Sequence, residues 1–234
     1  MPPVIGILSD AHGIAPAFDR AVDRLFQMGA ERLYFLGDAI GYVPSPAVLT
    51  SLEMLGERVV CLRGNHEDML LHGKYDAERE NIYQLELTRQ ILPNSYLNWI
   101  NSWTSFLSIT ISGMNILMIH GSPNDQTYGY VYPDTDLTQF THSANWVFMA
   151  HTHRPFIRVH EEIGYVNVGS CAMPRDDGRF GSAVLFDIGR QNARIIRFDI
   201  QDISRKIAHQ YPGVHSSVLA LYDRRSDVLI GEHL

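Results

Sequence analysis

The stretch VIGILSDAH, residues 4–12, sets two polar side chains directly after a short apolar segment. Its first part, Val4–Leu8, is apolar without interruption, which is the pattern of a strand buried on both faces. LYFLGD at residues 33–38 and VVCLRGNHE at residues 59–67 repeat this arrangement of an apolar run followed by polar residues. We therefore expect strands at 4–8, 33–36 and 59–62.

Helices are expected between these strands. Apolar residues from Pro16 to Met28 recur with helical spacing, and Gly29 follows as a stop signal. Ser45-Pro46 is typical of a helix start, and Gly56 of a helix end. Strands joined by helical crossovers pair in parallel, so residues 1–65 predict a largely parallel sheet.

The remainder of the chain has a different pattern. Two stretches of helix-forming residues with a break at Pro93-Asn94 predict a helical insert around residues 76–106. Shorter strands are expected after it, with hairpin turns at 113–115 and 189–192 and a last helix near 217–224. The expected strands are 108–112, 116–119, 146–149, 156–159, 165–168, 182–186 and 193–198. The sequence thus predicts an α/β fold of two packed mixed β-sheets flanked by helices, in a single domain spanning residues 1–234.

Composition narrows the class of partner. The formal net charge is −7 and no run of basic residues occurs, which argues against long nucleic acid as a partner. No apolar run approaches the roughly 20 residues of a membrane helix, and the N-terminal residues lack the basic start of a signal peptide. Cys61 and Cys171 are expected to be buried free thiols. We therefore expect a cytoplasmic protein that binds no membrane.

Polar residues of one chemical kind recur where the predicted strands end. They follow five apolar runs: Asp10 and His12, Asp38, Asn65 and His66, His120, and His151 and His153. Sites in open α/β sheets assemble at the carboxyl ends of parallel strands. Because residues two apart on an extended chain point to one side, Asp10 with His12, and His151 with His153, are each expected to form a pincer.

The chemistry of these side chains indicates a metal site. Imidazole and carboxylate are costly to bury without partners, so their repetition after buried strands is not explained by packing. Carboxylate, imidazole and amide oxygen together suit Mn, Fe or Zn. The sequence therefore predicts that these donors converge on bound metal.

In order along the chain, D-x-H, G-D, G-N-H-[DE], a lone His before Gly and a late H-x-H resemble the signature of calcineurin-like metallophosphoesterases. The turn NVGS at residues 167–170 is also similar to the family's N-x-G-S turn. The resemblance implies that Asp38 is shared between two sets of metal ligands: Asp10, His12 and His153 for one ion, and Asn65, His120 and His151 for the other. It implies that His66 faces the scissile phosphate and protonates or stabilises the leaving oxygen.

The activity implied by this resemblance is hydrolysis of a small phosphomonoester or phosphodiester. Two divalent ions (Mn, Fe or Zn) would hold a hydroxide between them and lower its pKa toward neutrality. Only Asp10 and Asp38 among the implied ligands are carboxylates, so the centre keeps a positive charge that suits an anionic substrate. Asp38 would thus bind both metal ions and act as a catalytic residue, because the hydroxide is held between those ions.

The segment GDAIGYVP, residues 37–44, departs from the Ser/Thr protein phosphatase branch, which reads G-D-x-V-D-R-G there. Gly41 stands where that branch has an aspartate behind the catalytic His, and Tyr42 where it has a phosphate-binding arginine. The segment resembles small bacterial phosphoesterases instead. Near the motifs, Arg154, Arg175 and Tyr42 are expected to contact substrate. Tyr128 and Tyr130 are expected to be cleft-wall or packing residues.

Other functions stay open at this point. The fold can serve as a catalytically idle scaffold that binds a partner, although every implied ligand and His66 are present here. Within the enzyme class, a protein phosphatase and a dinucleoside polyphosphate hydrolase are alternatives. A zinc amidohydrolase is disfavoured because its His-x-His pair comes early in the chain. A haloacid-dehalogenase-type phosphatase needs Asp-x-Asp where this chain has His12.

Overall fold

The computed structural model describes residues 2–73, 77–211 and 213–233. Its strands are β1 (Val4–Leu8), β2 (Arg32–Phe35), β3 (Val59–Cys61), β4 (Phe106–Ile111), β5 (Met114–Ile119), β6 (Trp146–Met149), β7 (Phe156–His160), β8 (Ile163–Asn167), β9 (Phe180–Asp187), β10 (Asn192–Asp199) and β11 (Glu232–His233). Its α-helices are α1 (Ala15–Gln27), α2 (Ala47–Leu55), α3 (Asn65–His72), α4 (Ala77–Tyr83), α5 (Leu85–Ile91), α6 (Asn94–Ser102), α7 (Gln201–Gln210) and α8 (Ser216–Leu219). Short 3-10 turns occur at 56–58, 137–139 and 220–223.

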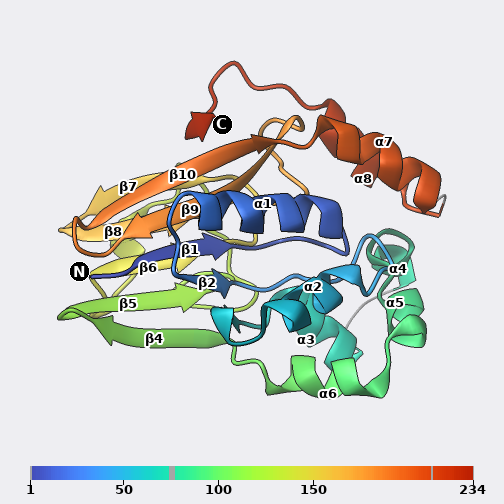
Figure 1. The fold of residues 1–234 in the computed structure, drawn as a ribbon, viewed down its shortest axis with the longest axis horizontal. Coiled ribbons are helices and arrows are strands. Elements are labelled where there is room, and N and C mark those ends of the chain that lie inside the picture. The colour runs from blue at the N-terminus through green and yellow to red at the C-terminus, as the bar shows by residue number, and fades with distance from the viewer. Residues whose placement is uncertain (1, 74–76, 212, 234) are drawn as a thin grey trace.

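Two mixed sheets form the centre of the molecule, with helices outside them (Figure 1). The first sheet has the strand order β11-β10-β9-β1-β2-β3, and the second has the order β4-β5-β6-β8-β7. β1, β2 and β3 pair in parallel, whereas β9 runs antiparallel to β1. In the second sheet, β5, β6 and β8 are parallel, and β4 and β7 form antiparallel edges. The predicted α/β fold with two packed mixed sheets is confirmed.

The alternation of side chains along β2 shows why its sequence is apolar throughout. Leu33 and Phe35 pack into the core beneath the helices, whereas Tyr34 and Leu36 belong to the core between the two sheets. Successive strand residues point to opposite faces, so a strand covered on both sides needs apolar residues at every position. The two sheets and the helices therefore bury the strand on both faces, and the polar residue Asp38 follows at its carboxyl end.

The strands that carry the polar motifs point to one end of the molecule. Figure 1 shows the arrowheads of β1, β2 and β5 directed toward the side where α3–α6 lie. β6 runs parallel to β5, so it ends on that side as well. The segments that follow these strands are thereby gathered at one edge of the sandwich.

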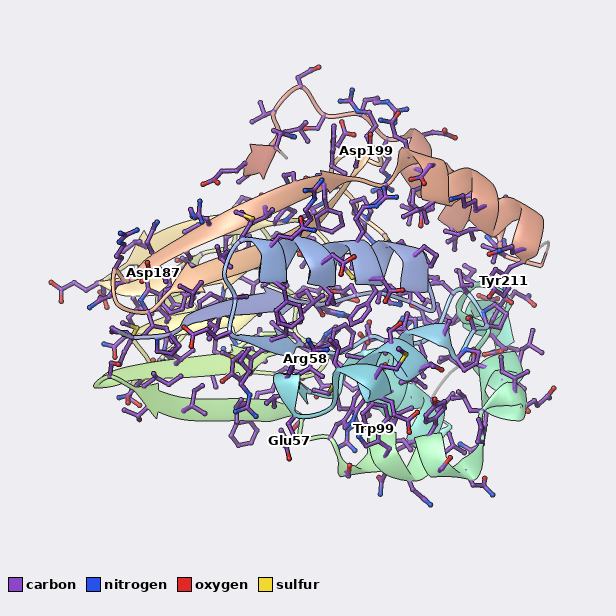
Figure 2. The ribbon with its side chains drawn as sticks, in the orientation of Figure 1. Glu57, Arg58, Trp99, Asp187, Asp199 and Tyr211 are labelled. Carbon is purple, nitrogen blue, oxygen red and sulfur yellow. The ribbon has the colours of Figure 1, made fainter. Side chains whose placement is uncertain are left out.

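The helical insert is confirmed over α4, α5 and α6, although position 76, where its start was predicted, lies outside the described residues. The insert has a further break at Gln84, whose φ of 52° divides the stretch before Pro93 into α4 and α5. Phe106 opens β4 rather than ending the insert. Trp99 of α6 lies partly buried on the side of the helix that faces the body of the molecule (Figure 2).

Two helices were missed by the sequence analysis: α3, which begins at Asn65, and α7 in the C-terminal region. Cys171 is buried as expected, whereas Cys61 is only partly buried, and both are free thiols. Among the described residues, no helix combines the length and the apolar character that a membrane crossing requires.

Candidate metal centre

The predicted metal-binding side chains meet at the edge of the sandwich described above. Each comes from the segment after a strand, and all are buried: Asp10 and His12 after β1, Asp38 after β2, Asn65 and His66 at the start of α3, His120 after β5, and His151 and His153 after β6. Burial of this many polar side chains together is costly unless their charges and lone pairs are matched. The cluster is therefore a built site rather than a by-product of packing.

Three overlapping groups of donor atoms make up the cluster, each with its atoms within 4.8 Å of one another: Asp10, His12 and His153; His12, Asp38 and His66; and Asp38, His120 and His151. Asp38 Oδ2 lies 3.8 Å from His12 Nε2 and 3.4 Å from His120 Nε2. Asn65 Oδ1 lies 3.0 Å from His120 Nε2, which adds an amide oxygen to the same group. Asp38 thus stands between the two outer groups.

Three of the imidazoles are held through their Nδ1 atoms by backbone carbonyls: His12 by Ile40 at 3.1 Å, His120 by Leu36 at 2.9 Å and His153 by Met173 at 2.6 Å. Each Nδ1–H donates to its carbonyl, so that whenever the ring is neutral its Nε2 lone pair is directed into the cluster. Carbonyl partners of this kind fix the tautomer of metal-binding histidines.

The donor set fits a cation in the group formed by Asp10, His12 and His153. Burial, the largest influence, lowers the pKa of His153 to about 4, so its ring is neutral near pH 7. The Nε2 atoms of His12 and His153 face each other at 3.2 Å, close enough for both to bind one cation. Asp10 Oδ1 lies 3.1 Å from His153 Nε2 and has no hydrogen-bond partner among the described residues.

The group formed by Asp38, His120 and His151 also favours positive charge. Burial lowers the pKa of His120, but the Asp38 carboxylate outweighs it and raises the pKa to about 9. Burial and the neighbouring His120 lower the pKa of His151 to about 3. His151 Nδ1 lies 3.2 Å from His120 Nε2, and its own Nε2 is buried with no partner among the described residues. These donors also suit a divalent ion.

The backbone of the cluster residues is unusual. Positive φ angles between 48° and 65° occur at five of them: Asp10, His12, Asp38, His151 and His153. Non-glycine residues rarely adopt this conformation, and such strain, on the order of 1–3 kcal/mol each, gathers at functional sites. The extended backbone expected at the two pairs is therefore wrong. Asp10 and His12 still share a group, whereas His151 joins the Asp38 group and His153 joins the Asp10 group, which is the division that the resemblance implied.

His66 occupies a different environment from the other cluster residues. Its backbone N–H donates to Asp38 Oδ1 at 2.9 Å, and its Nε2 lies 4.0 Å from Asp38 Oδ2. Its Nδ1 is buried without a partner among the described residues and faces Gly41, where a Cβ atom would lie 2.0 Å away. Gly41 therefore makes room for the ring and supplies no carboxylate behind it, as its departure from the protein phosphatase pattern implied.

A cavity of about 70 Å³ opens beside His66 and is lined by Asp38, Tyr42, Asn65, His66, Tyr83, Tyr130, His151, His153 and Arg175. Two of the predicted substrate contacts lie here, and Arg175 Nη2 donates to the Tyr42 hydroxyl at 3.1 Å. The third, Arg154, is exposed and does not line the cavity. Tyr83 was missed by the sequence analysis, because no motif marks it within the helical insert.

The loop that carries Arg175 is braced by the C-terminal segment. Asp177 accepts hydrogen bonds from the Arg179 guanidinium at 2.8 Å and from the Ser226 N–H at 3.0 Å. The Tyr222 hydroxyl donates to the carbonyl of Ala172 at 2.9 Å. The backbone carbonyl of Arg175 itself accepts a bond from Arg224 Nη1 at 3.1 Å. Residues 222–226 thus hold this side of the cavity in place.

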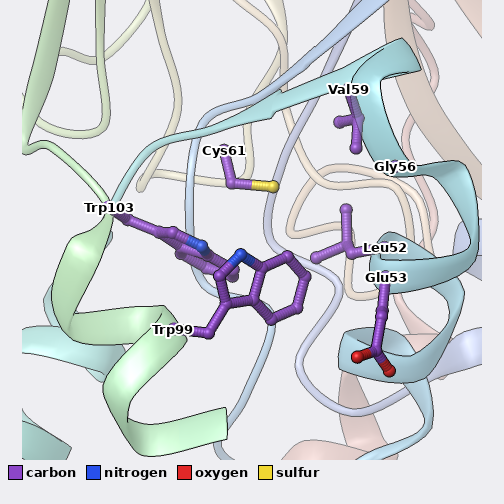
Figure 3. A pocket seen from close by; sticks show the side chains of 7 residues that line it. All are labelled: Leu52, Glu53, Gly56, Val59, Cys61, Trp99 and Trp103. Carbon is purple, nitrogen blue, oxygen red and sulfur yellow. The ribbon is translucent and has the colours of Figure 1, made fainter. Parts of the chain in front are cut away.

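A second cavity, of about 340 Å³, lies between α2, β3 and α6 and contains none of the cluster residues (Figure 3). Trp99 and Trp103 line it with their rings 5.2 Å apart and nearly perpendicular. Cys61 lies in the same wall, and burial raises the pKa of its thiol, which keeps it protonated. The rings of Trp99 and Trp103 thus pack against each other in the wall of this cavity.

The calcineurin-like phosphoesterase superfamily domain matches this chain over residues 4–191. The match covers all the cluster residues and every strand except β10 and β11. The chain therefore belongs to the calcineurin-like phosphoesterase superfamily. It is a metal-binding phosphoester hydrolase, and the enzyme class predicted from the sequence is confirmed.

Several relatives match most of the chain. An uncharacterized protein of Methanocaldococcus jannaschii is 25% identical over 225 residues, which are 87% of this chain and 91% of the relative. A probable metallophosphoesterase of Methanothermobacter thermautotrophicus is 27% identical over 201 residues, covering 83% and 92%. Phosphodiesterase YfcE of Escherichia coli is 25% identical over 181 residues, covering 71% and 78%. The chain is thus similar to bacterial and archaeal members of the superfamily.

Solved structures share the architecture. The crystal structure of a metallophosphoesterase from Sphaerobacter thermophilus has a TM-score of 0.78 at 18% identity, covering 95% of this chain and 99% of that one. A hypothetical protein from Pyrococcus horikoshii has a TM-score of 0.77 at 17% identity, covering 94% and 97%. At such identities the likeness concerns the fold, and the fold extends over nearly the whole chain.

Proposed function

We propose that the cluster binds two divalent cations, Mn, Fe or Zn, and that the protein hydrolyses phosphodiesters. The observation that carries this proposal is the position of Asp38 between two groups of inward-facing imidazole lone pairs. One group would use Asp10, His12 and His153, and the other Asn65, His120 and His151, with Asp38 shared. The bound ions would supply Lewis acidity and a nucleophile generated from water.

His66 is proposed to act on the leaving oxygen. It lines the cavity, and its backbone N–H is anchored to Asp38 Oδ1, so the ring is held beside the metal ligands. Among the described residues, no backbone carbonyl engages its Nδ1 or Nε2 atom, whereas carbonyls hold the Nδ1 atoms of His12, His120 and His153. This freedom suits a ring that donates a proton to substrate rather than a lone pair to metal.

Arg175 and Tyr42 are proposed to bind the phosphate group. Among the described residues that line the cavity, Arg175 has the one guanidinium, and its bond to the Tyr42 hydroxyl orients both groups. A single cationic side chain matches the single negative charge of a phosphodiester better than the two charges of a monoester. The name of the E. coli relative, a phosphodiesterase, supports this choice.

The test is to strip the purified protein of metal and reload it separately with Mn, Fe, Zn, Ni or Mg. Metal content should reach two ions per chain, and bis(p-nitrophenyl) phosphate should be hydrolysed faster than p-nitrophenyl phosphate. The substitution Asp38→Asn should abolish turnover, whereas Asp227→Asn, at an exposed carboxylate, should not. A phosphopeptide and a dinucleoside polyphosphate belong in the same panel, since preference for either would replace the proposed substrate class.

The alternative of a catalytically idle scaffold predicts a different result in the same experiment. A folded protein that binds no metal and hydrolyses none of these substrates would contradict the proposed function. Binding of one ion per chain with full activity would contradict only the dinuclear arrangement.

A further inference from the structure

The size of the cavity beside His66 limits what part of a substrate it can enclose. Its volume is about 70 Å³, whereas pockets that enclose whole organic ligands measure about 300 Å³ or more. The phosphate group fits inside, but the organic groups on either side of a diester must lie at the rim. Residues at the rim therefore decide which organic groups are accepted.

One part of the rim is formed by Tyr83 and lies against His66. The rings of Tyr83 and His66 are 4.7 Å apart, and the Tyr42 ring lies 5.2 Å from Tyr83. The carbonyl of Tyr83 accepts the Tyr42 backbone N–H at 2.6 Å, which fixes the end of α4 at this place. Because His66 is proposed to serve the leaving oxygen, this part of the rim belongs to the leaving side.

Another part of the rim is formed by Tyr130, which belongs to the tyrosine segment, residues 128–132. The Tyr130 ring lies 4.2 Å from the His151 ring, so it borders a different imidazole of the cavity. Tyr132 stacks on Tyr130 with centroids 6.0 Å apart and planes at 7°. Both rings are exposed, at 54% and 40% of their surface, although large aromatic side chains gain free energy from burial.

The backbone of the tyrosine segment is held by specific hydrogen bonds. The Tyr128 N–H donates to Asp125 Oδ1 at 2.9 Å, and the Tyr132 N–H donates to Thr135 Oγ1 at 2.8 Å. The Tyr128 hydroxyl donates to Asp68 Oδ2 at 2.7 Å. Two exposed parallel rings on an anchored backbone form a preorganised flat surface rather than a loose loop.

From these contacts we propose that Tyr130 and Tyr132 bind a planar aromatic group on the retained side of the phosphodiester, which makes the preferred substrate a nucleoside phosphodiester. A nucleobase stacks on aromatic side chains with about 1–3 kcal/mol per base and without demanding one particular base. The inference rests on the proposed phosphodiesterase function and adds the class of substrate to it. The acidic chain disfavours long nucleic acid, so the base belongs to a single nucleotide.

The test compares two diesters that share the p-nitrophenolate leaving group: thymidine 5′-(p-nitrophenyl phosphate) and methyl p-nitrophenyl phosphate. Since the leaving groups are identical, a difference in kcat/KM reports on the retained group alone. We expect the thymidine ester to be favoured by about 10-fold or more in the wild-type holoenzyme. Equal kcat/KM values for the two esters would overturn the inference while leaving the proposed function intact, whereas absence of turnover on both would overturn the function.

Variants locate the preference on the tyrosine segment. Tyr130→Leu should reduce the preference to about 2-fold or less and Tyr130→Phe should retain it, because stacking needs the ring and not the hydroxyl. Phe106→Leu, at an exposed aromatic residue outside the cavity, is the matched control and should leave the ratio unchanged. A preference that survives both Tyr130→Leu and Tyr132→Leu would contradict the assignment to these rings.

If a variant fails to fold, thymidine 5′-monophosphate and ribose 5-phosphate can be compared as inhibitors of the wild type. Inhibition by thymidine 5′-monophosphate about 10-fold stronger supports stacking, and equal inhibition contradicts it.

Discussion

The Glu67 carboxylate accepts the backbone N–H of Asp38 at 2.7 Å, and this bond ties the segment after β2 to the helix after β3. The same carboxylate accepts the N–H groups of Gly64 at 2.9 Å and Ala39 at 2.7 Å. Burial and the adjacent Asp38 raise the pKa of Glu67 to about 7, whereas these N–H donors favour the ionised form. Glu67 does not line the cavity beside His66. Because its carboxylate binds both the Asp38 and the Gly64 backbone, it fixes the distance between Asp38 and Asn65.

Replacing Glu67 with Gln should weaken both folding and metal binding. The amide keeps one acceptor oxygen but turns an NH₂ group toward backbone donors, which leaves buried N–H groups unsatisfied. We expect the free energy of unfolding of the metal-free protein to fall by about 1–3 kcal/mol, measured by urea denaturation. Metal affinity, measured by titration, should fall as well. Glu57→Gln, at an exposed residue of the turn before β3 (Figure 2), should change neither quantity.

The substitution His66→Ala should separate metal binding from turnover. The proposed ligand set does not include this imidazole, so metal content should match the wild type. Turnover of a diester with a poor leaving group, such as methyl phenyl phosphate, should fall by about 10²–10⁴-fold, the usual contribution of a general acid. The loss should be smaller with p-nitrophenolate, which needs less protonation. Equal losses on both esters, or no loss on either, would remove His66 from the proposed role.

Removal of metal should lower the thermal stability of the protein. The facing Nε2 atoms of His12 and His153, 3.2 Å apart, and the unpartnered Asp10 Oδ1 all gain from a bound cation. A ligand that binds only the folded state stabilises by about 2.7 kcal/mol at 100 times its Kd. Calorimetry with and without a chelator should therefore show a lower Tm for the stripped protein. We expect one cooperative transition in each case, as for the single domain predicted over residues 1–234.

Asp177 should make stability depend on pH in the acid range. Hydrogen bonds from the Arg179 side chain lower the pKa of its carboxyl well below the ordinary value near 3.9. The carboxylate therefore contributes its full stability above the ordinary pKa, and the contribution is lost as pH falls toward the folded-state pKa. The stability difference between wild type and Asp177→Asn should be about 1.5–3 kcal/mol near pH 7 and should shrink below about pH 4. A difference that is constant from pH 7 to pH 3 would contradict this account, and Asp227→Asn serves as the exposed control.

Much of the fold could be predicted because its strands are buried on both faces. The run at Val4–Leu8 gave its strand without error, since no alternative element explains five apolar residues before Asp10. α3 was missed because its first turn, at Asn65 and His66, consists of polar site residues that hide the helical pattern. α7 was missed because its sequence contains few large apolar residues; Ile203 and Ile207 are the two that the structure shows to be buried.

The composition of the candidate site could be predicted, but its geometry could not. Motif order identified the side chains that converge, since each follows a strand that ends at one edge. The left-handed backbone at His151 and His153 has no signature in a sequence without glycine, and only the family resemblance implied that the two rings belong to different groups. Tyr83 lines the cavity because the insert packs beside it, and no local pattern in the sequence indicates this packing. The exposure of Arg154 to solvent likewise depends on tertiary structure and not on its position next to His153.

The brace formed by Tyr222, Arg224 and Ser226 on the Arg175 loop lies beyond residue 191, where the match to the superfamily domain ends. The guanidinium at the cavity mouth is thus aimed by a part of the chain that carries no superfamily motif. Substitutions in this tail should therefore shift Arg175 while leaving the cluster residues in place.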